Sequence, residues 1–313
     1  MRWLIILSFL IRFDVGKCTD PWSFIVLADW HGGETFAKTP GTESESWQKH
    51  LETIRYIQQT AGGDLIIFPG DTQNGKWDTE EFINSFDPSL EPEDSVLAAG
   101  ENCYRTIRNL FEEGGYPKIL MAIGDHELGG NGWSPSSSKV RSLPQFRQGF
   151  IDEFNRDMEG NFRFQESIGN ATARPLGTKF KETSFAHRHK NALFITIDAF
   201  HVVGQGEDPF LDRKDGLGGE GIITCTVQGK HLDWLEEVLS EAQINRSINH
   251  IFVQAHLPIL QPVRKVACSG QFMDGAENSN FWKLMAKYEV DLVSQAVLNG
   301  MIIAQFSGTR VNI

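Results

Sequence analysis

The stretch Ser23-Phe-Ile-Val-Leu-Ala-Asp-Trp-His31 decides the fold, because a short apolar run ends there in two side chains that can bind a metal ion. Gly32 and Gly33 follow, so the run is predicted to be a buried strand that stops at a loop. Alternate side chains of an extended backbone point the same way, and Asp29 and His31 can therefore face one pocket. An Asp-x-His triplet is common by chance, so its weight depends on how the other strands end.

Three further apolar runs end in acidic or imidazole side chains. They are Asp64-Leu-Ile-Ile-Phe-Pro-Gly-Asp71, Lys118-Ile-Leu-Met-Ala-Ile-Gly-Asp-His-Glu127 and Asn249-His-Ile-Phe-Val-Gln-Ala-His256. Helical spacing of apolar residues between the runs predicts strand–helix–strand units, which require right-handed crossovers and a largely parallel sheet. One edge of the sheet should therefore collect six side chains: Asp29, His31, Asp71, Asp125, His126 and His256.

Periodicity also predicts the other elements. Helices are expected near residues 42–59, 95–113, 146–158, 229–242 and 281–288. A hairpin is expected from residues 183–187 and 192–199, and its turn carries His187 and His189, which are outside candidates for metal binding. The glycine-rich segment 216–221 matches a dinucleotide-binding fingerprint by letter, but a strand is predicted after it instead of a helix, so we interpret it as a loop.

The bulk composition indicates one large α/β domain. The chain has 313 residues, of which 40% are hydrophobic and 22% charged, and its formal net charge is -12. Such an acidic protein would repel the phosphates of nucleic acids, and no basic cluster offsets this. No nucleic-acid partner is therefore expected, and an anionic substrate would need a local source of positive charge.

The N-terminus is typical of a secretory signal. A cationic start precedes a mostly apolar stretch from Trp3 to Ile11, which is too short to span a bilayer. We expect residues 1–18 to be a signal peptide, with cleavage after Cys18, and the protein to be secreted or held in the secretory-pathway lumen, with no transmembrane span. The sequons Asn170-Ala-Thr172 and Asn245-Arg-Ser247 are consistent with glycosylation there. Of the remaining cysteines, Cys225 with Cys268 is one possible disulfide, which would leave Cys103 free.

Oxygen and imidazole ligands without thiolates suit Zn, Fe or Mn, and an aspartate shared between two ions is the simplest way to hold a pair. The order Asp-x-His, Gly-Asp, Gly-Asp-His-Glu and His-x-Pro resembles the calcineurin-like metallophosphoesterase family over about residues 24–293. The resemblance implies an αββα sandwich of two mixed sheets flanked by helices. It assigns residues 19–293 to the catalytic domain.

The resemblance also implies a role for each residue at the sheet edge. Asp29 and His31 would bind the first of two divalent or trivalent metal ions, and Asp71 would bridge both. Asp125 and His256 would bind the second, and His126 would be catalytic, protonating the leaving group or holding the phosphoryl oxygens. The implied activity is hydrolysis of a small phosphate mono- or diester by metal-activated water.

Three departures from the family pattern stand out. Position 125 is Asp where the family has Asn, and Asn74 replaces the residues typical of purple acid phosphatases and Ser/Thr phosphatases. The last family motif, Gly-His-x-His, is missing, and residues 294–313 form an atypical tail instead. We expect this tail to be an alternative or mispredicted ending of an ordinary member. The alternative function is a catalytically impaired member that binds a phosphorylated ligand or a protein partner.

Overall fold

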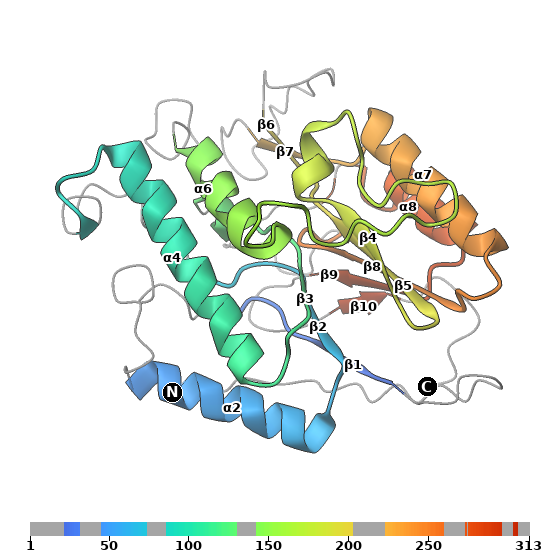
Figure 1. Ribbon diagram of the computed structural model, residues 1–313. Helices are drawn as coiled ribbons and strands as arrows, with labels where there is room; N and C mark the ends of the chain where they lie inside the picture. Colours follow the sequence, from blue (N-terminus) through green and yellow to red (C-terminus); the bar gives the residue numbers. More distant parts are fainter. Residues whose placement is uncertain are drawn as a thin grey trace.

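Two β-sheets lie face to face between two layers of helices in the computed structural model (Figure 1). The structure describes residues 22–31, 45–73, 86–129, 142–202, 223–259, 273, 275–295 and 303–305. This arrangement confirms the predicted α/β sandwich. Among the described helices, none is long and apolar enough to cross a membrane.

The first sheet is parallel throughout its described strands, in the order β1-β2-β3. Its strands are β1 (Phe24–Val26), β2 (Leu65–Phe68) and β3 (Ile119–Met121), joined through the helices α2 (Glu45–Ala61) and α4 (Pro92–Glu113). Parallel neighbours need such helical crossovers, and the apolar stripes of both helices pack on the sheet. Trp47, Leu110 and Phe111 are nearly or fully buried there.

The second sheet is mixed, with strand order β10-β9-β8-β5-β4. Its strands are β4 (Phe185–His189), β5 (Ala192–Ile197), β8 (His250–Ala255), β9 (Leu292–Gln295) and β10 (Ile303–Gln305). The helices α7 (Gly229–Ile244) and α8 (Asn280–Lys287) provide the crossovers between its parallel strands β5, β8 and β9. The predicted hairpin is confirmed as β4–β5, and part of the tail joins the sheet as β10, antiparallel to β9.

Alternation of side chains along the strands builds two apolar layers. One set faces the partner sheet and forms a layer rich in aromatic rings, with Phe24 within 5.0 Å of Phe252 and 5.2 Å of Phe194 between ring centroids. The opposite set, including Ile66 and Ile195, packs with the helices. Both sheets are therefore fixed relative to each other, which holds their strand ends in register.

One predicted helix differs from the structure. The segment predicted at 146–158 is helix α6 (Leu143–Phe150) followed by a π-helical turn, η2 (Ile151–Asn155). Met158, at the end of the predicted helix, is 94% exposed. The helix stops because Asp157 caps a tight turn, accepting hydrogen bonds from the backbone of Glu159 and Asn161. A short two-stranded sheet, β6 (Phe200–Val202) with β7 (Ile223–Cys225), completes the described elements.

Candidate metal centre at the ends of four strands

The loops after β1, β2, β3 and β8 meet at one edge of the sandwich. The loop after β1 is tied to the loop after β2 by backbone hydrogen bonds, from Asp29 to Gly70 (3.3 Å) and from His31 to Asp71 (3.1 Å). These bonds continue the β1–β2 pairing beyond the regular strands. The carboxyl ends of parallel strands share an edge, and for that reason the predicted residues come together.

Three of the site residues adopt a left-handed backbone. The φ angles are 51° for Asp29, 49° for His31 and 61° for Asp71. A non-glycine residue in this region costs on the order of 1–3 kcal/mol and persists only where the surroundings impose it. The left-handed conformation turns the backbone sharply after strands β1 and β2, so that all three side chains point toward the same site.

Two glycines allow the loops to approach closely. A Cβ atom on Gly124 would lie 2.3 Å from Asp71 Oδ1 and 2.6 Å from Glu127 Oε2. A Cβ atom on Gly70, whose φ is 103°, would lie 2.9 Å from both Gly124 Cα and His256 Nδ1. Any side chain at either position would push apart the loops that carry Asp71, Asp125 and His256.

Glu127 links the loop after β2 to the loop after β3 through hydrogen bonds to their backbones. Its fully buried carboxylate accepts hydrogen bonds of 2.8 Å from the backbone N–H groups of Asp71, Thr72 and Gly124, and another from the Thr72 hydroxyl. One side chain therefore joins the loop after β2 to the loop after β3. Gln73 adds a second link, donating from Nε2 to the carbonyl of His126 at 2.6 Å.

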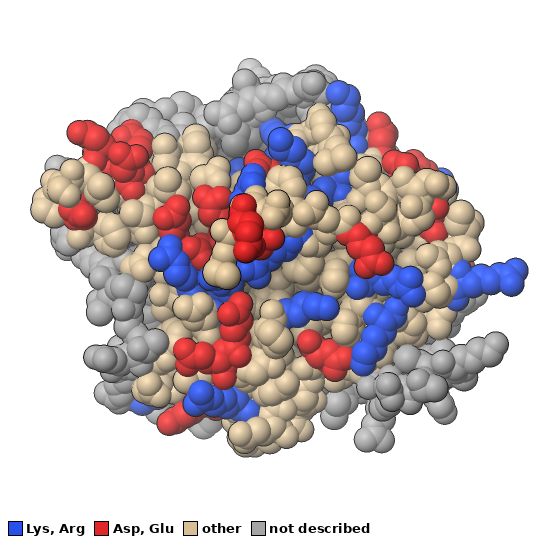
Figure 2. Space-filling model, in the orientation of Figure 1, with Lys and Arg blue, Asp and Glu red and all other residues tan. Residues whose placement is uncertain are grey.

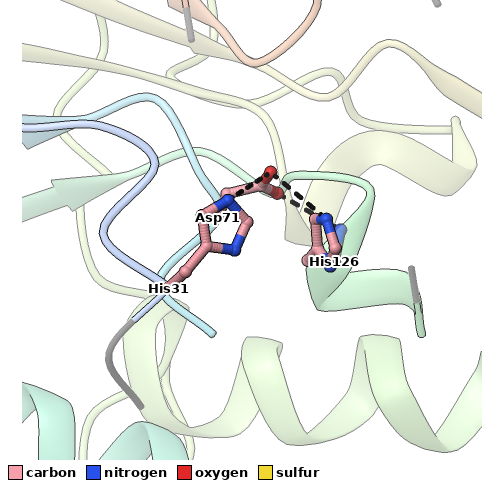
Figure 3. Close-up of side chains that lie close together, drawn as sticks. All are labelled: His31, Asp71 and His126. Atoms are coloured by element: carbon pink, nitrogen blue, oxygen red, sulfur yellow. Dashed lines mark hydrogen bonds and ion pairs between the residues drawn. The ribbon is translucent and has the colours of Figure 1, made fainter. Parts of the chain in front are cut away.

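Asp71 lies at the centre of the cluster. Its Oδ2 atom is 3.6 Å from His31 Nε2 and 3.9 Å from His126 Nε2, and Figure 3 shows both imidazoles directed at this carboxylate. Its Oδ1 atom is 3.5 Å from His256 Nε2 and accepts a 3.2 Å hydrogen bond from the backbone of His126. The two carboxylate oxygens thus face different histidines.

His256 is oriented by its other ring nitrogen. Nδ1 lies 3.0 Å from the carbonyl oxygen of Pro69 and so carries the proton that it donates there. This leaves Nε2 directed at Asp71 and Asp125, the latter at 2.7 Å from Oδ1. Histidines that bind metals usually donate their second N–H to a carbonyl or carboxylate in this way.

Burial perturbs the acid–base chemistry of the cluster. Burial raises the pKa of Asp29 to about 6 and that of Asp71 well above its usual range. It lowers the pKa of His31 to about 4. Burial also opposes the charge on His256, but the nearby carboxylates outweigh it and raise that pKa well above normal. Carboxylates crowded together away from water are stabilised by a bound cation.

The residues fit a metal centre. Asp29 Oδ1, Asp125 Oδ2 and His31 Nδ1 are buried without a hydrogen-bond partner. Within the described part of the chain, two groups have ligand atoms mutually within 4.8 Å: His31, Asp71 and His126, and Asp29, Asp71 and His256. Oxygen and nitrogen donors without sulfur suit Zn, Fe or Mn, and a shared aspartate suits a pair of ions.

The structure brings all six predicted residues together at this edge. Asp125 stands in neither three-residue group and pairs with His256, so its role as a ligand stays a prediction. His187 and His189 lie elsewhere. His187 packs on Phe164, with ring centroids 4.9 Å apart, and His189 contacts Asp64 beside the β4–β5 turn, so neither can complete the centre.

Glu127 and the two glycines are the functional residues that sequence reasoning left without a role. Glu127 directly follows Asp125 and His126 in the sequence, and this adjacency is the feature that could have indicated its role. Cys103 lies buried in helix α4. The side chains of Cys225 and Cys268, with their proposed disulfide, lie outside the described residues, as do residues 1–18 and most of the tail.

A sequence model of calcineurin-like phosphoesterases matches residues 23–295. No curated protein sequence matches the chain significantly.

Among solved structures, a purple acid phosphatase from yellow lupin seeds is 11% identical, with a TM-score of 0.46, and covers 87% of this chain. This chain spans only 37% of the lupin enzyme. A dimetal phosphatase from Danio rerio is 12% identical, with a TM-score of 0.44, covering 92% of this chain and 88% of its own.

Proposed function

Since the chain belongs to the calcineurin-like phosphoesterase family, we propose that it hydrolyses small phosphate esters at a centre of two metal ions shared through Asp71. The observation that carries the proposal is the division of Asp71 between two groups of ligands. Oδ2 faces His31 and His126, and Oδ1 faces His256. A single carboxylate placed in this way can hold two ions side by side.

The protein groups would hold, orient and shield the reacting atoms. Asp29, His31, Asp71 and His256, with Asp125 beside them, supply the ligand atoms. Bound metal ions would act as Lewis acids on the phosphoryl group and lower the pKa of the attacking water. Glu127 and the glycines keep the ligand-bearing loops at fixed separation, so little reorganisation is needed when substrate binds.

The metals would also supply the positive charge that a phosphate ester requires. The protein carries a formal charge of -12, and on the face drawn in Figure 2 its Lys and Arg side chains lie among Asp and Glu side chains. Several arginines of the described residues are already engaged in ion pairs, such as Arg105 with Glu153 at 2.9 Å. Metal ions at the strand ends would therefore provide the local attraction for an anionic substrate.

The test is metal-dependent hydrolysis by the purified full chain. An aryl phosphate monoester and the corresponding diester are offered to protein stripped by a chelator and then supplied with Zn²⁺, Mn²⁺ or Fe²⁺. We expect turnover only after metal is restored, and the preferred ester identifies the substrate class. Absence of turnover with two bound ions per chain would instead favour the alternative, a member that only binds phosphorylated ligands.

We also propose that the protein is secreted and glycosylated. Asn170 is exposed at a tight turn and its amide donates to Glu241 of α7, while Asn245 caps the end of the same helix. This end of α7 leads into the start of β8 and lies away from His256, so glycans there would leave the metal centre accessible. Expression in eukaryotic cells tests this. We expect N-terminal processing and a loss of mass on N-glycosidase treatment. The double substitution Asn170→Gln and Asn245→Gln should abolish the loss of mass and leave the N-terminal processing unchanged.

A further inference from the structure

Strand β5 also ends in an acidic residue, Asp198, at the same edge of the sandwich as the metal centre. Ile197, the last residue of β5, lies beside Ala255, the last residue of β8. Asp198 and His256 therefore leave the sheet at the same level, one from each strand. Asp198 is fully buried. Its place in the fold is that of a metal ligand, and its contacts decide whether it can be one.

Both carboxylate oxygens of Asp198 are already bonded. Oδ2 pairs with the guanidinium of Arg147 in α6 and accepts a 2.6 Å hydrogen bond from the Thr183 hydroxyl. Oδ1 accepts a 2.9 Å hydrogen bond from the backbone N–H of Phe200. Asp29, by contrast, keeps a buried oxygen without a hydrogen-bond partner. A buried carboxylate with such partners is satisfied without a cation, so Asp198 is not a metal ligand.

The pair of Asp198 and Arg147 fixes the backbone of Phe200 on both sides. Asp198 accepts from the N–H of Phe200, and Arg147 Nη2 donates to its carbonyl oxygen at 3.3 Å. The planar fork of an arginine can hold a carboxylate and a carbonyl at once. The Phe200 side chain is 1% exposed and stacks with the imidazole of His256, with ring centroids 6.1 Å apart and planes inclined by 30°. Phe200 therefore links the ion pair to a residue of the metal centre.

The ring of Phe200 limits the motion that the bonds of His256 leave free. His256 Nδ1 is held by the Pro69 carbonyl at 3.0 Å, and Nε2 lies 2.7 Å from Asp125 Oδ1, so both nitrogens are anchored. The imidazole can still tilt about the line that joins these two atoms. An aromatic ring packed on one face opposes the tilt and excludes water from that face. Nε2 then stays directed at the carboxylates of the centre.

From these contacts we propose that Asp198 and Arg147 are positioning residues for the metal centre. They act through Phe200 on His256 and so strengthen the binding of the metal ion that His256 holds. The inference rests on the metal centre of the proposed function. Residues that orient a metal-binding histidine from behind typically contribute about 10–100-fold to metal affinity. The ion pair therefore does more than attach α6 to the end of β5.

The metal affinity of Phe200→Leu tests the proposal. The full-length protein is stripped and titrated with Zn²⁺ or Co²⁺ against a competing chelator. We expect about 10-fold weaker binding in Phe200→Leu, because leucine keeps an apolar side chain but lacks the flat ring. Phe194→Leu is the matched control, since Phe194 is equally buried but packs between the sheets against Phe24 and Phe252. Wild-type affinity in Phe200→Leu, or an equal loss in both variants, overturns the proposal.

A double-mutant cycle tests whether Arg147 acts through Phe200. Arg147→Lys keeps a positive charge beside Asp198 but loses the fork that also reaches the Phe200 carbonyl. It should weaken metal binding by less than Phe200→Leu does. Combined with Phe200→Leu, it should cause no further loss of metal affinity, because the ring through which it acts is already gone. Losses that multiply in the double variant overturn this route.

Proton exchange at His256 gives a readout that needs no metal. In the stripped protein, the Nδ1 proton donated to Pro69 should give a slowly exchanging imidazole signal by NMR, identified by its loss in His256→Gln. Phe200→Leu and Arg147→Lys should each speed its exchange with water, because the imidazole is less confined. Phe194→Leu should not. Unchanged exchange in Phe200→Leu contradicts the proposed confinement of the ring.

Hydrolysis assays on the same preparations separate this inference from the proposed function. Metal affinities that follow the expected pattern, without hydrolysis by wild type, uphold the positioning role and contradict the phosphoesterase. Hydrolysis by wild type, together with unchanged metal affinity in Phe200→Leu, does the reverse. A wild-type chain that binds no metal contradicts both.

Discussion

Aspartate and histidine cluster at both ends of the sandwich, but the two clusters differ in how their charges are balanced. At the metal centre, the ion pairs of Asp71 within the described residues are all with histidines. At the opposite edge, Asp64 contacts Lys190 at 2.7 Å and His189 at 3.0 Å. We call these two clusters the site edge and the opposite edge.

The environment of each cluster decides what it can do. Asp64 is partly exposed, and although burial opposes its charge, the bonds from Lys190 and His189 outweigh it and lower its pKa. Asp29 is half-buried, its Oδ1 atom is buried without a hydrogen-bond partner, and burial raises its pKa to about 6. The same residue types therefore form a satisfied ion pair at one edge and an incomplete coordination shell at the other.

The largest effect is expected for Asp71→Asn at the site edge. Loss of the shared carboxylate removes a ligand from both groups, so metal binding fails and hydrolysis falls by at least about a thousandfold. The stripped protein should melt no lower than stripped wild type, because the change removes one of several crowded buried carboxylates. Metal analysis, ester hydrolysis and thermal melting measure the three effects. Hydrolysis near the wild-type level would contradict the bridging role.

Glu127→Gln should weaken both the fold and the metal centre. The Glu127 carboxylate accepts hydrogen bonds from backbone N–H groups, whereas the NH₂ group of a glutamine would place a donor against one of these donors. The unfolding free energy is therefore expected to fall by about 2–3 kcal/mol. Metal affinity should fall about 10–100-fold, since the loops carrying Asp71 and Asp125 loosen. Chemical denaturation and metal titration measure both.

Glu236→Gln is the matched control for this change. Glu236 pairs on the surface with Lys287 at 2.6 Å, far from the centre, so its substitution should cost much less unfolding free energy than Glu127→Gln and leave metal affinity unchanged. Equal losses in both variants would mean that Glu127 has only a general stabilising role.

Metal itself should stabilise the site edge selectively. At a concentration of 100 times the dissociation constant, a bound ion adds about 2.7 kcal/mol, or about 5 °C in melting temperature for a chain of this size. Hydrogen exchange should slow at the loops after β1, β2, β3 and β8 and stay unchanged at the β4–β5 turn. Protection that appears equally at both edges would argue against a localised centre.

The sequence predicted the strand ends well because each signal is local. An apolar run followed by a polar residue marks where a strand leaves the core, and four such runs identified Asp29, Asp71, Asp125 and His256 with their neighbours. Parallel topology then requires these ends to meet. Nothing beyond the order of residues was needed for this step.

The grouping of ligands could not be predicted in the same way. It depends on left-handed backbone turns at Asp29, His31 and Asp71, and the residue types at these positions do not predict such turns. It depends also on Glu127 bonding to Asp71 across 56 residues. The helix predicted through Met158 failed for a related reason, since an Asp157 turn ended it despite a favourable apolar pattern.

The smallest effect is expected at the opposite edge, for Asp64→Asn. The ion pair with Lys190 is partly exposed, so its loss should cost about 0.2–1 kcal/mol and leave metal binding and hydrolysis unchanged. Because the folded-state pKa of Asp64 is lowered, its contribution is complete above the ordinary carboxyl range near pH 4. It disappears as the pH falls through the lowered value.

The difference in unfolding free energy between wild type and Asp64→Asn should therefore be present at pH 7 and shrink toward zero near pH 2–3, where the carboxyl is protonated in both folded and unfolded chains. Added salt should shrink it at pH 7 as well. Denaturation at each condition measures it. A difference that persists at low pH would show that Asp64 acts through its hydrogen-bond geometry, and the contrast between the two edges would then lie in burial alone and not in charge balance.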